Sequence, residues 1–421
     1  MKLRYALNDR LPAGHLLMYG LQWLIISIPN VLTVAMLAKI QFYDDVAMQM
    51  LYLQKLYVVI GLVMLVQALW GHRMPLVAGP AAVLIVGILS AQSAGFNAVY
   101  TAIAVCGAAV FLIFISGLMG KIQKLFTPRI IITILGLISM TLAPVFLGLI
   151  FSGGDMLFNF AFTVVAIIAT FILNDRLPGV WKSVTLMITV IAGTAIYYAW
   201  NAVPELPSTG HSLQIGDLFI TPEFNAGAII SFLICFFALL INELGSIQSV
   251  KDMVGADRPE QRIGRGCAVT GLGNALSGML GVIGPVDFSV SPGIIATTGC
   301  ASRYTIVPCA IGLIVCAFCP PLIRIFTMLP DLIIGVMLMY IVVLQLAASF
   351  NMMVESRCVT TFNHALTIAI PLGIGLFVAL LPQQVVALLP PLLQPVLSNG
   401  FVIGVLIVVF LEHLVFAEKK L

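Results

Sequence analysis

Apolar runs of about 20 residues recur along the whole chain, and short polar segments separate them. A helix rises 1.5 Å per residue, so about 20 apolar residues are needed to cross the hydrocarbon core of a bilayer. The pattern therefore predicts an all-α integral membrane protein with fourteen spans, of which the third and the tenth are short. The spans are expected near residues 15–38, 55–71, 76–91, 97–118, 129–151, 157–174, 180–199, 227–249, 267–283, 290–300, 303–323, 331–350, 364–381 and 399–417.

Composition agrees with a lipid bilayer as the surroundings of the chain. Hydrophobic residues make up 61% and charged residues only 9%, whereas soluble proteins carry roughly a quarter charged residues. The net charge of +3 is small, and the basic residues are dispersed between apolar runs, so they form no patch that could follow a nucleic-acid backbone. Nucleic acid is therefore excluded as a partner.

The basic residues predict the orientation of the chain in the membrane, because lysine and arginine are retained in cytoplasmic loops. With the N-terminus inside, three of the 20 Lys and Arg residues, Lys39, Lys55 and Arg324, fall outside, and the other 17 fall inside. If one span had been counted wrongly, the basic residues after it would be assigned to the opposite side and the excess inside would disappear. We expect a multi-pass protein of the cell (inner) membrane with both termini in the cytoplasm.

The longest outside loop, residues 201–226, divides the chain into two halves of seven spans, residues 1–200 and 227–421. The third span of each half opens with the same dipeptide, Gly79-Pro80 in the first and Gly284-Pro285 in the second. Short spans interrupted by Gly and Pro at matching places are typical of an inverted repeat whose binding site lies at the midplane.

Apolar and polar residues alternate from Val286 to Ser291, which predicts an extended segment rather than a helix. Ser291-Pro292 is then typical of a helix start. Two such extended segments at membrane depth could pair with each other and direct two half-helix N-termini at one point, the expected binding site. The alternative is that the prolines only kink two ordinary spans.

Two carboxyl groups are the candidate functional residues. Glu243 lies in the eighth span, and a carboxylate there costs several kcal/mol unless it is paired, hydrated or protonated. It is a candidate for substrate binding and for proton coupling, with an ion pair to a distant span as the alternative. Asp287 is the second candidate, with a loop position near the outer mouth as its alternative. No catalytic residues, metal ligands or cofactor motifs are recognised, so we expect no enzyme.

Several stretches carry a resemblance to a known family. Pro75 to Ala82 looks like a third-span Pro-(x)-Leu-Gly-Ser-Ser-Phe-Ala stretch, and Phe288 to Gly293 looks like a tenth-span Phe-Ser-Gln-Asn-Val-Gly signature. Gly335 to Tyr340 is similar to a twelfth-span segment ending in a site tyrosine, and Leu21 to Trp23 resembles a first-span Leu-Gln-His with tryptophan for histidine. Together these residues resemble the nucleobase-ascorbate transporter family, the uracil, xanthine and urate permeases. The resemblance implies seven plus seven spans in core and gate domains, and a homodimer formed through the gate.

The resemblance also implies roles for individual residues. Glu243 falls on the family glutamate that binds the base and would accept a ring N–H. Phe288 and Ala82 would contact the base, backbone near Ser289 would bind a carbonyl, and Tyr340 would belong to the site.

Val290 departs from the family, because it replaces the Gln or Glu that binds the other polar edge of the base. An unpaired polar edge costs about 1–3 kcal/mol. Either the substrate differs, or Asp287 or Ser291 takes over this contact.

We therefore expect a secondary active symporter for a purine or pyrimidine base, similar to xanthine or uracil and driven by protons through Glu243. A proton is preferred over sodium because one buried carboxylate suffices for it. The alternative is an anion carrier of the same inverted-repeat fold, which would use the half-helix dipoles and would still transport after Glu243→Gln.

Overall fold

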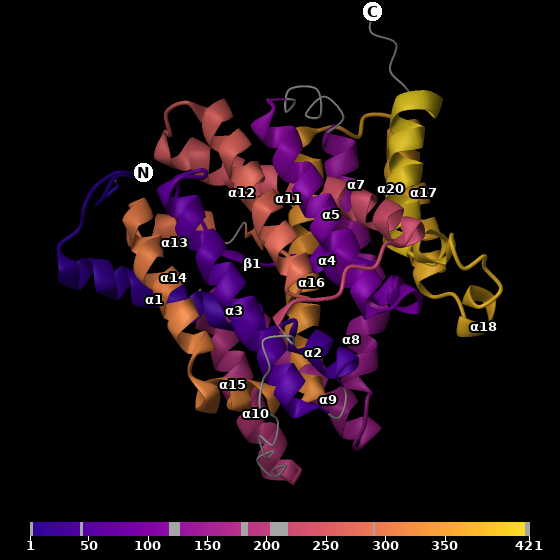
Figure 1. Ribbon diagram of the computed structural model, residues 1–421, viewed down its shortest axis with the longest axis horizontal. Helices are drawn as coiled ribbons and strands as arrows, with labels where there is room; N and C mark the ends of the chain where they lie inside the picture. The colour runs from indigo at the N-terminus through magenta and orange to yellow at the C-terminus, as the bar shows by residue number, and fades with distance from the viewer. Residues whose placement is uncertain are drawn as a thin grey trace, which may run out of the picture.

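The computed structural model shows a bundle of helices with one short pair of strands at its centre (Figure 1). It describes residues 3–42, 45–117, 127–177, 184–202, 218–288 and 291–416. In this part of the chain eight helices are long and apolar enough to cross a membrane, or nine if one bent pair counts as a span. A helical membrane protein is therefore confirmed, whereas the count of fourteen spans stays a prediction.

The first half of the chain forms helices and the first of the two strands. In order these are α1 (Ala13–Leu32), α2 (Ala35–Gln41), α3 (Val46–Leu69), β1 (Ala78–Pro80), α4 (Ala82–Ser90), α5 (Phe96–Ile115), α7 (Pro128–Thr141), α8 (Ala143–Ile150), α9 (Met156–Arg176) and α10 (Thr185–Trp200).

The second half begins with the long helix α11 (Ala226–Val254). It is followed by α12 (Pro259–Met279), β2 (Pro285–Asp287), α13 (Ser291–Thr298), α14 (Ile306–Ala317), α15 (Pro320–Thr327), α16 (Asp331–Ser356), α17 (Phe362–Ala379), α18 (Gln383–Val386), α19 (Gln394–Leu397) and α20 (Gly400–Phe410), which continues into a π-helical turn at Leu411–Val415.

Polar side chains begin several of the long helices by satisfying backbone N–H groups that have no partner within the helix. Asp45 accepts from Met48 N–H before α3, Asp155 caps α9, and Asn225 accepts from Ala228 N–H before α11. These caps fix where the apolar runs enter the bundle.

One predicted span is sharply bent, and two others are interrupted by a short turn but still count as single spans. The run at 303–323 ends as α14 at Ala317, and α15 turns away from it by 80°. Pro320 and Pro321 explain the break, because proline lacks an N–H and cannot continue a helix. The first span is divided into α1 and α2, and the fifth is divided at Leu142 into α7 and α8, which has Pro144 in its first turn.

The helices pack in two groups, each with members from both halves of the chain. The core group comprises α1, α3, α4, α5, α11, α12, α13 and α14, and the gate group comprises α7, α8, α9, α10, α16, α17 and α20. The groups are named after the core and gate domains that the resemblance implies, and those domains stay a prediction. The division into two repeats at residues 201–226 stays a prediction, and residues 203–217 of that loop lie outside the described residues.

The two strands lie within the core group and pair in antiparallel register. Ala78 lies opposite Asp287, Gly79 opposite Val286, and Pro80 opposite Pro285. Hydrogen bonds extend the pairing at both ends, from Ala81 N–H to the Gly284 carbonyl and from Phe288 N–H to the Val77 carbonyl. The expected pair of extended segments before half-helices is therefore confirmed, and the kinked-span alternative is wrong.

Candidate functional site

Glu243 lies near the middle of α11, and its side chain is completely buried. Its Oε1 accepts a hydrogen bond of 2.7 Å from the hydroxyl of Thr270 on α12, and its Oε2 accepts one of 2.9 Å from the backbone N–H of Asp287 on β2. The Gln67 amide of α3 lies 3.5 Å from Oε1 and donates over shorter distances to Thr270 and to the Gly266 carbonyl. Three helices and a strand therefore meet at this carboxyl group.

Asp287 is also inside the protein, with only 1% of its surface exposed. Its carbonyl accepts a 2.8 Å hydrogen bond from the Ser246 hydroxyl of α11, and its Oδ2 lies 3.1 Å from Nε2 of the buried His72. A loop position near the outer mouth is therefore wrong for Asp287. Its side chain belongs to the same buried cluster as Glu243.

The cluster holds two carboxyl groups without a permanent cation. In the described part of the chain neither Glu243 nor Asp287 pairs with a lysine or arginine, and His72 makes the only ion-pair contact with either. The ion pair to a distant span is thus not what holds Glu243. Ionising two neighbouring buried carboxyl groups together is costly, so the arrangement favours retention of a proton.

The strand pair brings further predicted residues together. Phe288 is half-buried, and its ring lies over Gly79, where an added Cβ would come within 2.4 Å of Phe288 Cε2. Ala82 is half-buried at the start of α4. The Ser291 hydroxyl accepts the Val77 N–H at 3.1 Å and donates to the Phe288 carbonyl at 3.3 Å. Gly79 is required here because a larger residue would displace the ring.

Other predicted residues are not brought to this cluster. Ser289 and Val290 lie outside the described residues. Tyr340 lies on α16 in the gate group, where its ring centroid is 4.9 Å from that of Phe171. No hydrogen bond or ring contact in the described part of the chain joins Tyr340 to the strand pair.

Sequence reasoning missed three residues of the cluster: Gln67, His72 and Thr270. Gln67 interrupts an apolar run, and a polar side chain in a span is unusual enough to have marked it. His72 follows the end of that run and resembles an ordinary loop residue, because nothing in its neighbours predicts burial.

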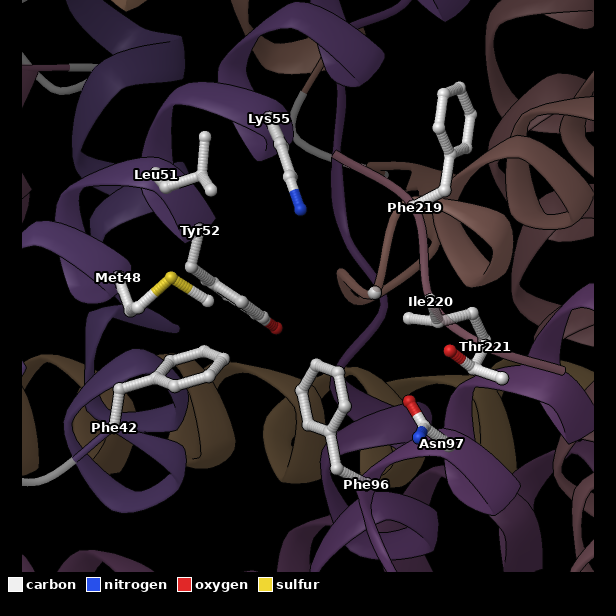
Figure 2. Close-up of a pocket in the computed structure, with 11 residues that line it drawn as sticks. Phe42, Met48, Leu51, Tyr52, Lys55, Phe96, Asn97, Phe219, Ile220 and Thr221 are labelled. Atoms are coloured by element: carbon white, nitrogen blue, oxygen red, sulfur yellow. The ribbon is translucent and has the colours of Figure 1, made fainter. Parts of the chain in front are cut away.

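The structure also contains a cavity of about 200 Å³ at the start of α3 and α5 (Figure 2). Phe42 and Phe96 line one side, while the ammonium group of Lys55 and the hydroxyl of Tyr52 point into it. That hydroxyl accepts the backbone N–H of Ile283 at 3.1 Å, close to the start of β2. None of the predicted site residues lines this cavity, so it is separate from the buried cluster.

The Xan_ur_permease model, described as a permease family, matches residues 14–384. The chain belongs to this permease family. The match confirms the resemblance to the nucleobase-ascorbate transporters. Members of a permease family are transporters, so the expectation that the chain is not an enzyme is also confirmed.

Two relatives show what the sequence is similar to. A purine permease of Clostridium perfringens (strain 13 / Type A), provisionally so named, is 26% identical over 312 residues, which cover 72% of this chain and 68% of the relative. The uric acid permease PucJ of Bacillus subtilis (strain 168) is 22% identical over 360 residues, 81% of this chain and 78% of PucJ.

A solved structure shares the fold. The transmembrane domain of the cyanobacterial bicarbonate transporter BicA superposes with a TM-score of 0.63 at 14% identity, covering 88% of this chain and 98% of that domain. The fold is thus of the same inverted-repeat class as that transporter domain, whereas the exact count of seven plus seven spans stays a prediction. The cytoplasmic termini and the homodimer stay predictions.

Proposed function

We propose that this permease is a secondary active transporter that moves a purine base across the cell membrane together with a proton. The observation that carries this proposal is the fully buried Glu243, held at the end of the strand pair without a lysine or arginine partner among the described residues. A carboxyl group in that setting can take up and release a proton as the surroundings open to one side and then the other. Sodium is disfavoured, because it needs several converging oxygen atoms.

The relatives support a purine rather than a pyrimidine or a small anion, since their names specify purine and uric acid transport. The shared fold with a bicarbonate transporter does not favour the anion-carrier alternative, because similarity at 14% identity establishes the fold only. The base would stack against the half-buried Phe288, beside Ala82. Ser291 and Asp287 are the polar groups that would bind the second polar edge of the base, which Val290 cannot bind.

Glu243 would hold the coupling proton and bind a ring N–H of the base. Its oxygens already accept from Thr270 and from the Asp287 backbone. A carboxylate has about four lone-pair sites, so these two donors and the more distant Gln67 amide still leave room for a ligand. The carboxyl group would therefore bind both the proton and the base, so that the binding of one depends on the other, as symport requires.

The test is uptake into proteoliposomes that contain the purified protein. Radiolabelled uric acid, xanthine, uracil and bicarbonate are offered with an inward pH gradient, in sodium-free and sodium-containing buffers. We expect a purine to accumulate without sodium and a protonophore to abolish the accumulation. Uptake of bicarbonate alone would refute the proposal. Purine uptake that strictly requires sodium would refute the proton as the coupling ion.

Two variants locate the coupling step. Glu243→Gln should lose gradient-driven accumulation, because glutamine cannot release a proton. Cys316→Ala with Cys319→Ala is the control, since both cysteines lie at the break between α14 and α15, and no hydrogen bond among the described residues joins them to the cluster. Wild-type accumulation in Glu243→Gln would contradict the role of Glu243.

A further inference from the structure

His72 is an unexpected member of the buried cluster. It lies in the turn between α3 and β1, and none of its surface is exposed. Its Nδ1 accepts a hydrogen bond of 2.9 Å from the backbone N–H of Met74. A neutral imidazole has one donor and one acceptor nitrogen, so this contact assigns the proton to Nε2.

The protonated nitrogen faces a carboxyl oxygen. Nε2 lies 3.1 Å from Oδ2 of Asp287, although the N–H direction is off the line between the two atoms. In the described part of the chain neither of these two buried atoms has another hydrogen-bond partner. Each is therefore the group available to satisfy the other.

The backbone of His72 is fixed independently of its ring. Arg262 on α12 donates to the carbonyls of His72 and Arg73 over 3.0 and 3.1 Å, and it also pairs with Asp257 at 2.5 Å. The Arg262 guanidinium lowers the pKa of Asp257, which lies between α11 and α12, so this pair stays charged. The ring is consequently presented to Asp287 from a rigid support.

The charged and titratable groups around the cluster come from every element packed on it. They are Glu243 on α11, Asp287 on β2, Arg262 and the Cys267 thiol on α12, and His72 itself. Arg262 directs its donors to backbone carbonyls and to Asp257 rather than to either buried carboxyl group. Glu243 accepts from Thr270 and from the Asp287 backbone, whereas the Nε2–H of His72 is the donor that faces the carboxyl group of Asp287 in the described part of the chain.

We propose that His72 is a positioning residue for proton coupling: its Nε2–H stabilises the ionised form of Asp287 and so weakens the binding of the single proton that Asp287 and Glu243 share. A hydrogen bond to the charged form of an acid favours that form. No proton passes through the imidazole in this scheme. The inference rests on the proposed function, because it specifies which neighbour sets how tightly the cluster of Glu243 and Asp287 holds the coupling proton.

Two substitutions of His72 separate this role from others. His72→Gln retains an N–H donor near the position of Nε2 but cannot relay a proton, whereas His72→Met fills the space and offers no donor. Without the donor, ionised Asp287 is less stable and the cluster binds its proton more tightly. The loss of base affinity with rising pH should then occur about one pH unit higher in His72→Met, a tenfold change in proton affinity.

The measurement is equilibrium binding of radiolabelled uric acid to purified protein between pH 5 and 9, with the thermal unfolding midpoint recorded at each pH. We expect the His72→Gln profile to match the wild type and the His72→Met profile to be displaced upward. In the Asp287→Asn background, His72→Met should cause no further displacement of the unfolding profile, because no charge remains to be stabilised.

Each of the other possible results would contradict one specific part of the proposal. Failure of the wild-type protein to bind any base would remove the proposed function, whereas pH-independent binding by the wild type would remove coupling through the cluster. Wild-type behaviour of His72→Met would overturn the role of His72. Loss of the pH dependence in His72→Gln would overturn the positioning role in favour of a proton relay through the imidazole. If His72→Met lowered the unfolding midpoint equally in the wild type and in the Asp287→Asn background, His72 would have only a packing role.

Discussion

Removing the carboxyl group of Glu243 should cost a large part of the stability of the protein. In Glu243→Ala the Thr270 hydroxyl and the Asp287 N–H lose their acceptor, at present 2.7 and 2.9 Å away. Each unsatisfied buried donor costs about 1–3 kcal/mol, so the free energy of unfolding should fall by roughly 2–6 kcal/mol. In Glu243→Gln the amide oxygen can still accept from Asp287 while the new NH₂ donates to Thr270. The loss should then be about 1 kcal/mol.

Thermal unfolding in detergent measures this difference. At roughly 2 °C per kcal/mol, Glu243→Ala should unfold about 4–12 °C below the wild type and Glu243→Gln within about 3 °C of it. Gly245→Ala is the matched control on the same helix, because its added Cβ would meet no atom within 4 Å beyond the adjacent backbone of the helix itself. An unfolding midpoint of Glu243→Ala equal to that of the wild type would refute the assignment of these donors to Glu243.

Further substitutions test the strand pair and the gate group. Gly79→Ala should displace the Phe288 ring, because the new Cβ would lie 2.4 Å from Cε2. The free energy of unfolding should fall by about 1–3 kcal/mol, and base binding should weaken. Gly293→Ala is the control, because the space around its Cβ is open and neither effect is expected. Unchanged binding of the base by Gly79→Ala would exclude Phe288 from the site. Arg129→Gln should break the 2.8 Å pair with the buried Glu412 and lower the free energy of unfolding by about 3–5 kcal/mol, as measured by thermal unfolding. A smaller loss than that of an exposed arginine variant would contradict a structural role for this pair.

The fold could be predicted largely because the membrane imposes simple constraints on sequence. Apolar length predicted the long helices, and the two Gly-Pro dipeptides with the alternation after Gly284 predicted the strand pair. The break after Ala317 was missed although Pro320 marks it, because the apolar run continues across the proline. Span length alone cannot distinguish one bent helix from a straight one.

The site was predictable only where a residue conflicts with its surroundings. Glu243 is such a conflict, since a carboxyl group interrupts an apolar span. Gln67 conflicts less strongly with the apolar run around it. His72 does not conflict with its neighbours in the sequence at all, because its burial depends on how α12 packs over the turn after α3. Contacts that depend on tertiary packing between distant segments leave no local pattern in the sequence.

The pairing of β1 with β2 has a consequence for biosynthesis. Val77 and Ser291 are hydrogen-bonded but lie 214 residues apart in the chain. At about 5–20 residues per second, the ribosome needs roughly 10–40 s to deliver the second strand after the first. During that time β1 has exposed backbone groups at membrane depth, where unpaired N–H and C=O groups are costly. The first half must therefore wait within the insertion machinery or in a partly hydrated state, and the buried cluster at the strand pair cannot form before the chain has been made as far as Ser291.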